Sequence, residues 1–104
     1  MPIIEQIRKK IKGNKFEFSR HAVDQSIFRN ITVQEVREAF FHDPKIIEKY
    51  PNDKYGPSCL ILGFTEYKRP LHILCSYPSR PILKIITLYE PDPLKWIDYQ
   101  TRRK

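Results

Sequence analysis

The spacing of apolar residues changes at Pro44 from a helical period to a strand period. Before Pro44, apolar side chains recur every three or four residues, whereas the apolar runs after it are short and separated by turns. Those runs cover residues 45–50, 58–64, 71–77 and 82–89. Helices that precede a block of strands predict an α+β domain in which the helices pack on one face of a sheet.

Two helices are predicted within the first 30 residues. In the first, isoleucines recur at helical spacing up to Ile11, and Gly13 and Asn14 supply the stop. A short strand, KFEFS, separates it from the second helix, which Ser19 caps and which runs to about Arg29. The apolar stripe of this second helix consists of Ala22, Val23 and Ile27.

The start of a third helix is the strongest local signal in the chain. Thr32 and Glu35 have the spacing of a capping box, in which each residue satisfies a backbone N–H group of the other. Ile31 and Val36 flank this box and can close over it as a hydrophobic staple. The helix is expected to end before Pro44, because the residue that precedes a proline is disfavoured in helical geometry.

The four runs after Pro44 predict an antiparallel meander, because their connections are short. With the KFEFS segment, the sheet would have four to five strands. Pairing Tyr77 with Ile82 places His72 opposite Thr87, with Tyr89 on the next diagonal of the same face. Asp92 and Pro93 then predict a short terminal helix, which Leu94 and Ile97 would anchor.

This register, with Phe64 paired to Leu71, makes one face of the sheet nearly all apolar. Lys84 falls on that face, which indicates a slip or a bulge in the last strand. A slip of one residue would reverse the assignment of the faces. The predicted core face consists of Leu60, Leu62, Phe64, Leu71, Ile73, Cys75, Tyr77, Ile82, Ile86 and Leu88.

Composition limits the classes of protein to which the chain can belong. Its 104 residues fit one domain, and a net charge of +7 favours anionic partners such as nucleic acid, although a merely soluble basic protein has the same charge. No run is long enough to cross a membrane, and no secretory signal precedes residue 15, so a cytoplasmic location is expected. Cys59 and Cys75 lack metal-ligand spacing and are expected to be buried thiols, so no metal or cofactor is predicted.

Histidine is the residue that could carry out acid–base chemistry in this chain. His21, His42 and His72 are its three histidines, and two of them, or one with Tyr89, would suffice for metal-free RNA cleavage. Arg20, Arg29 or Lys84 could stabilise the charge that develops on phosphate, and Arg20 and His21 stand at a helix N-terminus that favours anions.

Each of these residues also has a structural interpretation. A histidine near a helix cap commonly packs its ring and bonds a backbone group, which applies to His21 and more strongly to His42. Arg29 could equally bind the side chain of Glu35 or Glu38. His72 alternates within a strand beside the predicted neighbours Thr87 and Tyr89, and this arrangement favours a functional role.

The segments SRHAVDQSIFRNITVQEVREAF, GPSCLILGF, RPLHILCSY and KIITLYEPDPLKW together resemble the family called domain of unknown function 4258, over about residues 16–96. Gln25 and Asn30 stand where the family often has Arg and Gly, and the first change removes a phosphate ligand. These domains look like relatives of RelE/BrnT-type bacterial toxins, which implies a RelE-like architecture and mRNA cleavage. The positions that match the family pattern are His21, Ala22, Arg29, Ile31, Thr32, His72, Tyr89 and Glu90.

The residues and the resemblance together predict a metal-independent endoribonuclease of a bacterial toxin–antitoxin system. Its expected partners are RNA, either free or on the ribosome, and an acidic antitoxin protein. The alternative is a non-catalytic basic module that binds nucleic acid or a partner protein. The predicted acid–base residues are His21, His72 and Tyr89, and the predicted phosphate ligands are Arg20, Arg29 and Lys84.

Overall fold

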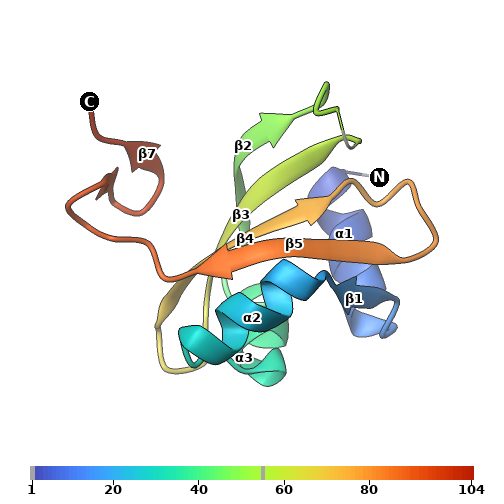
Figure 1. The fold of residues 1–104 in the computed structure, drawn as a ribbon, viewed down its shortest axis with the longest axis horizontal. Coiled ribbons are helices and arrows are strands. Elements are labelled where there is room, and N and C mark those ends of the chain that lie inside the picture. Colours follow the sequence, from blue (N-terminus) through green and yellow to red (C-terminus); the bar gives the residue numbers. More distant parts are fainter. Residues whose placement is uncertain (1, 55) are drawn as a thin grey trace.

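A five-stranded mixed sheet with three helices forms the main body of the structure, a computed structural model that describes residues 2–54 and 56–104. The strand order is β1-β5-β4-β3-β2 (Figure 1). The predicted α+β class and the predicted order of elements up to residue 89 are confirmed. The elements are α1 (Ile3–Lys12), β1 (Phe16–Phe18), α2 (Arg20–Phe28), α3 (Val33–Ala39), β2 (Lys45–Tyr50), β3 (Ser58–Phe64), β4 (Pro70–Ser76), β5 (Leu83–Tyr89), β6 (Trp96–Ile97) and β7 (Thr101–Arg102).

Strand β1 makes the sheet mixed, because it pairs with β5 in parallel. Phe16 lies opposite Leu83 and Phe18 opposite Ile85, while the other neighbouring strands of this sheet are antiparallel. The prediction of an antiparallel sheet is therefore wrong at this edge. Turn signals report how consecutive strands pair, whereas β1 and β5 lie at opposite ends of the chain and have no turn in common.

Side-chain caps position α2 and α3 as the sequence predicts. The Ser19 hydroxyl accepts a hydrogen bond from the Ala22 N–H at 3.0 Å and donates one to the Ile86 carbonyl at 2.8 Å. This residue therefore begins α2 and also ties it to β5. Thr32 and Glu35 form the complete capping box of α3. Asn30, with φ of 56°, takes the left-handed conformation predicted for the end of α2.

Strand β3 lies very close to the end of helix α3 at Gly63. A Cβ atom built on Gly63 would lie 2.0 Å from the carbonyl oxygen of Ala39 and 2.6 Å from its carbonyl carbon. Both are backbone atoms, which cannot turn aside as a flexible side chain can. Only glycine therefore fits at this position.

The main core joins buried residues of α1, α2 and α3 to alternate residues of the central strands. Leu71 and Ile73 of β4 belong to this core, and the side chain of His72 between them points to the opposite side of the sheet, here called the His72 face. The buried core residues are Ile7, Ile11, Ala22, Ile31, Val36, Ala39, Phe40, Cys59, Ile61, Leu71, Ile73, Cys75, Leu83, Ile85 and Leu88.

The apolar stripe predicted for α2 is only partly buried. Ala22 is completely buried in the core, whereas Val23 is 42% exposed and Ile27 is 74% exposed. The prediction is therefore confirmed for the first of these residues and wrong for the other two.

Strand β3 pairs with β4 one residue away from the predicted register. Leu62 lies opposite His72, which places Leu60 and Leu62 on the His72 face and leaves Cys59 and Ile61 in the core. The predicted faces of β3 are therefore reversed. Its residues from 58 to 63 are all buried, so apolar alternation in the sequence could not distinguish the two faces.

Strand β5 contains the irregularity that Lys84 indicated. His72 lies opposite Tyr89, two residues from the predicted partner Thr87, so both aromatic rings still share one face. Between this pair and the start of β5 the register shifts, and Ile86 becomes an extra residue. Consequently, the predicted core residue Ile86 lies outside the buried cluster. Ile82, which also was predicted for the core, is 44% exposed.

The segment after β5 forms a hairpin in place of the predicted terminal helix. Trp96 pairs with Arg102 in the two-stranded β6–β7 ribbon, which follows the end of β5 in Figure 1. The Asp92 carboxylate accepts a hydrogen bond from the Leu94 N–H at 2.8 Å, but the chain then reverses at residues 98 and 99, which have positive φ. Leu94, a predicted anchor, is 84% exposed. Asp-Pro opens a single turn as readily as a helix, which explains the wrong prediction.

Within the ranges that the structure describes, no helix combines the length and the apolar character needed to cross a bilayer.

Candidate functional site

His72 on β4 lies at the centre of the polar side chains on the His72 face. Its Nε2 atom lies 2.6 Å from the carbonyl oxygen of Tyr99, and its Nδ1 atom lies 3.2 Å from the hydroxyl of Tyr89. Because a carbonyl can only accept, the neutral ring carries its proton on Nε2 and presents a lone pair at Nδ1. The Tyr89 hydroxyl therefore donates a hydrogen bond to Nδ1 of His72.

The His72 side chain is completely buried, and two aromatic rings pack against its imidazole. The Trp96 ring lies 4.4 Å from it between centroids and nearly perpendicular, and the Tyr89 ring lies at 5.2 Å. Burial lowers the pKa of His72 below its usual value, although the Tyr99 carbonyl and the charge of Glu48 oppose this effect. The imidazole is therefore neutral near pH 7 and able to accept a proton.

An ion pair between β2 and the terminal hairpin borders this ring. The Arg102 guanidinium donates to both carboxylate oxygens of Glu48, at 2.8 and 3.1 Å, and lies 4.6 Å from the Trp96 centroid. The Tyr50 hydroxyl donates to the same carboxylate. The hydrogen bond from Arg102 lowers the pKa of Glu48, while burial and the neighbouring carboxylate raise the pKa of Tyr50. Both groups keep their ordinary charge at neutral pH.

A hollow of about 260 Å³ opens on the His72 face beside Tyr89. Ser58 is 1% exposed, and its hydroxyl has no hydrogen-bond partner among residues 2–54 and 56–104. A buried polar atom without a partner is rare, and a ligand in the hollow could supply one. The hollow is lined by Tyr50, Asp53, Ser58, Leu60, Leu74, Thr87, Tyr89 and Arg102.

A second hollow of about 230 Å³ lies along β5 toward the start of α2. Ser19 and Lys84 line it, and Asp53 lines both hollows. The two hollows therefore adjoin at Asp53. An extended ligand could occupy both of them.

The structure brings two of the six predicted site residues together, namely His72 and Tyr89. His21 and Arg20 are exposed on the first turn of α2. The Arg29 side chain donates to Gln25 at 2.8 Å, and Lys84 forms an ion pair with Glu17 at 3.4 Å. Among residues 2–54 and 56–104, no hydrogen bond or ion pair joins these four residues to His72.

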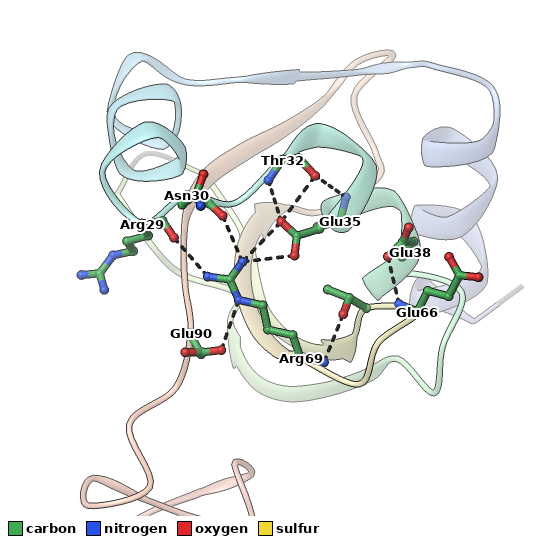
Figure 2. Close-up of polar contacts among 9 residues, drawn as sticks. Arg29, Asn30, Thr32, Glu35, Glu38, Glu66, Arg69 and Glu90 are labelled. Atoms are coloured by element: carbon green, nitrogen blue, oxygen red, sulfur yellow. Dashed lines mark hydrogen bonds and ion pairs between the residues drawn. The ribbon is translucent and has the colours of Figure 1, made fainter.

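Sequence reasoning missed Arg69, which organises the corner between α2 and α3 (Figure 2). Its guanidinium donates to the carbonyls of Arg29 and Asn30, both at 3.0 Å, and to the carboxylates of Glu35 and Glu90, both at 3.1 Å. Burial alone would raise the pKa of Glu35, but hydrogen bonds from the Thr32 backbone and Arg69 outweigh burial and lower it. Glu35, which was suggested as a partner of Arg29, therefore forms its ion pair with Arg69.

Replacing Arg69 with alanine is expected to lower the free energy of unfolding by about 2 kcal/mol, because it leaves Glu35 and two carbonyls without their donor. Arg69→Lys should recover less than half of this loss, since an ammonium group cannot reproduce the planar fork. Urea denaturation measures both values. Lys45→Ala, which removes an exposed ion pair of 3.9 Å, is the control and should cost less than about 0.5 kcal/mol. Equal costs for the two alanine variants would contradict the role given to Arg69.

Several other contacts of the site also had no readable signal in the sequence. Trp96, Tyr99 and Arg102 reach His72 and Glu48 from the segment that follows Asp92 and Pro93, where only a short terminal helix was predicted. Neither the Glu48–Arg102 pair nor the buried Ser58 hydroxyl follows a recognisable motif.

Comparison with known proteins identifies one family. Residues 18–90 match the model of a family described as a domain of unknown function (DUF4258). No curated protein and no solved structure matches the chain. The matched segment includes His72 and Tyr89 and ends before Trp96, Tyr99 and Arg102.

Proposed function

We propose that this chain, which belongs to the DUF4258 family, is a metal-independent endoribonuclease with the architecture of RelE-type toxins. The observation that supports this proposal is the Tyr89–His72 pair, a hydroxyl that donates to a neutral imidazole at the edge of a hollow. The net charge of +7 favours RNA as the anionic substrate. The resemblance to RelE/BrnT-type toxins further suggests an acidic antitoxin as the protein partner.

The Tyr89–His72 pair would act as a proton relay in the cleavage step. The ribose 2′ oxygen attacks the adjacent phosphorus, forming a 2′,3′-cyclic phosphate and breaking the bond to the 5′ oxygen. As the 2′-hydroxyl gives its proton to the Tyr89 oxygen, the Tyr89 proton passes to Nδ1 of His72. The resulting imidazolium is stabilised by the Tyr99 carbonyl at Nε2 and by the negative charge of Glu48.

The hollow supplies groups that suit a phosphate. The Arg102 side chain is 62% exposed, so it can bind an anion while it remains paired with Glu48. The hydroxyl of Ser58, which has no hydrogen-bond partner among the described residues, can donate to a phosphate oxygen. These groups would stabilise the charge that develops on the phosphate during the attack.

The remaining predicted residues are assigned to the second hollow and the adjoining start of α2. Lys84 would bind phosphate from its place in the lining. Arg20 and His21 follow Ser19, which also lines that hollow, so RNA that spans both hollows reaches the first turn of α2. Solvent water would protonate the leaving 5′ oxygen, because the attacking and leaving oxygens share one phosphorus and His21 lines neither hollow. His21 on the first turn of α2 and Arg29 at the other end of the helix are proposed as further contacts to RNA.

The experiment is incubation of the purified full chain with a single-stranded RNA oligonucleotide in excess EDTA. We expect a product that ends in a 2′,3′-cyclic phosphate, and no product from the matched 2′-deoxy oligonucleotide. Ribosomes carrying a message are the second substrate, because toxins of this type act on free or ribosome-bound mRNA. If the chain cuts neither the oligonucleotide nor the ribosome-bound message, the proposed enzymatic function is wrong.

A second function is favoured by the enclosure of His72, whose two ring nitrogens are both bonded and whose ring is covered by Trp96. A basic module that binds nucleic acid or a partner protein needs no access to this imidazole. Binding of RNA that weakens steeply with salt, without cleavage under any condition, would establish the module in place of the enzyme.

A further inference from the structure

A hollow of about 650 Å³ lies on the polar side of α1, away from the residues that line the Tyr89 hollow. It is bordered by α1, by the turn that follows this helix, and by the loop between β4 and β5. We call it the lysine groove, and its lining consists of Gln6, Lys9, Lys10, Lys12, Gly13, Lys15 and Pro78.

The charge in the lysine groove is not balanced by acidic side chains. Among the described residues, Lys9, Lys12 and Lys15 have no ion-pair partner, and no acidic residue lines the groove. The one acidic residue of α1, Glu5, is bonded to Arg8 at 3.0 Å. An excess of unpaired cations around a concave surface raises the local concentration of anions.

The borders of the lysine groove are held together by Lys10. Its ammonium donates to the carbonyl of Pro81 at 3.1 Å, which ties α1 to the loop between β4 and β5. Lysines near a helix C-terminus also offset the helix dipole, and this effect accounts for Lys9 and Lys12. It does not account for Lys15, which lies beyond the end of α1 and faces the same hollow.

We propose that the lysine groove binds the phosphodiester backbone of single-stranded RNA, as a second subsite apart from the Tyr89 hollow. This inference rests on the proposed function, because it takes RNA as the ligand of the chain. Lysines are flexible point charges that suit phosphates, and no aromatic side chain in the lining offers a base a stacking surface. Binding in the groove should therefore be independent of RNA sequence.

The lining also favours RNA over an acidic protein partner. Stable protein interfaces are centred on large apolar or aromatic anchors that fill pockets. Apart from lysine stems, the lysine groove offers only Pro78 as an apolar side chain. A phosphate chain needs no such anchor, because its affinity comes from released counterions.

The test measures how the full chain binds a single-stranded RNA whose 2′-hydroxyls are methylated, so that it cannot be cleaved. The variant Lys9→Gln/Lys12→Gln/Lys15→Gln should bind about tenfold more weakly at low salt. The slope of log affinity against log salt should become shallower by about 2, as expected for three lost contacts to single-stranded phosphates. The control, Lys45→Gln/Lys68→Gln/Lys104→Gln, loses the same charge from exposed positions outside the groove and should change affinity by less than about twofold.

The outcomes separate this inference from the proposed enzyme. Unchanged RNA affinity in the groove variant would overturn the RNA subsite, even if the wild-type chain cleaves RNA. A tenfold loss in a chain that never cleaves RNA would support the subsite and overturn the enzyme. Equal losses in the groove and control variants would mean that only total charge matters, which overturns the groove as a site. Displacement of the RNA by polyglutamate at a lower concentration than by unlabelled RNA would point to an acidic protein and overturn the RNA assignment.

Discussion

Replacing Gly63 with alanine is expected to lower the free energy of unfolding by about 3 kcal/mol or more. The new methyl group would lie 2.0 Å from the Ala39 carbonyl oxygen, so α3 and β3 would have to separate. Ala39 is completely buried, and its displacement would disturb the packing of Phe40 and Val36 in the core. Thermal and urea denaturation measure the loss, which should appear as a fall in the melting temperature of more than about 10 °C.

A matched glycine provides the control for this substitution. A Cβ atom on Gly13 would meet the Lys9 carbonyl oxygen at 3.4 Å, and the φ of Gly13 is −85°, which alanine adopts without strain. Gly13→Ala should therefore change stability by less than about 1 kcal/mol. If Gly63→Ala proved as stable as Gly13→Ala, the close contact between α3 and β3 would not exist in the protein.

Replacing Tyr89 with phenylalanine is expected to slow RNA cleavage between about 100-fold and 10,000-fold, the range typical of acid–base groups. The phenyl ring keeps its packing beside His72 and loses only the hydroxyl that donates to Nδ1. RNA affinity and melting temperature should therefore remain close to those of the wild-type chain. The measurement is the single-turnover cleavage rate in EDTA, with enzyme in excess over RNA.

Two further variants make this result specific to the relay. His72→Gln should slow cleavage to a similar extent, because its amide can still donate to the Tyr99 carbonyl but cannot accept a proton at neutral pH. Tyr67→Phe removes a hydroxyl from a side chain that is 90% exposed and should cleave at the wild-type rate. Wild-type cleavage by both Tyr89→Phe and His72→Gln would remove the relay from the mechanism.

Local features of the fold could be predicted from the sequence, because they depend on residues three or four positions apart. Ser19 and the Thr32–Glu35 box mark where α2 and α3 begin, and Asn30 marks the left-handed corner between them. Lys84 correctly indicated a bulge, since an ammonium group is difficult to bury in a core. Each of these signals comes from a single residue or from residues no more than about one helical turn apart in the sequence.

Features that depend on distant residues could not be predicted in the same way. The faces of β3 were reversed because the terminal hairpin helps to cover the second side of the sheet, which removes the usual contrast between apolar and polar positions. Strand alternation was enough to place His72 and Tyr89 on one face of the sheet. No pattern in the sequence indicated that Tyr99 and Arg102 would reach this face from the terminal hairpin. Arg69 binds two carbonyls, and backbone acceptors leave no trace in a sequence.

The parallel pairing of β1 with β5 has a consequence for how the chain folds during its synthesis. At about 5–20 residues per second, a ribosome would make β1 several seconds before β5. Strands β2 to β4 can pair as soon as they emerge, but Phe16 and Phe18 wait for Leu83 and Ile85. A nascent chain that stops before Leu83 would therefore leave Phe16 and Phe18 without their strand partners, and exposed apolar segments of this kind favour aggregation until the last strand of the sheet is made.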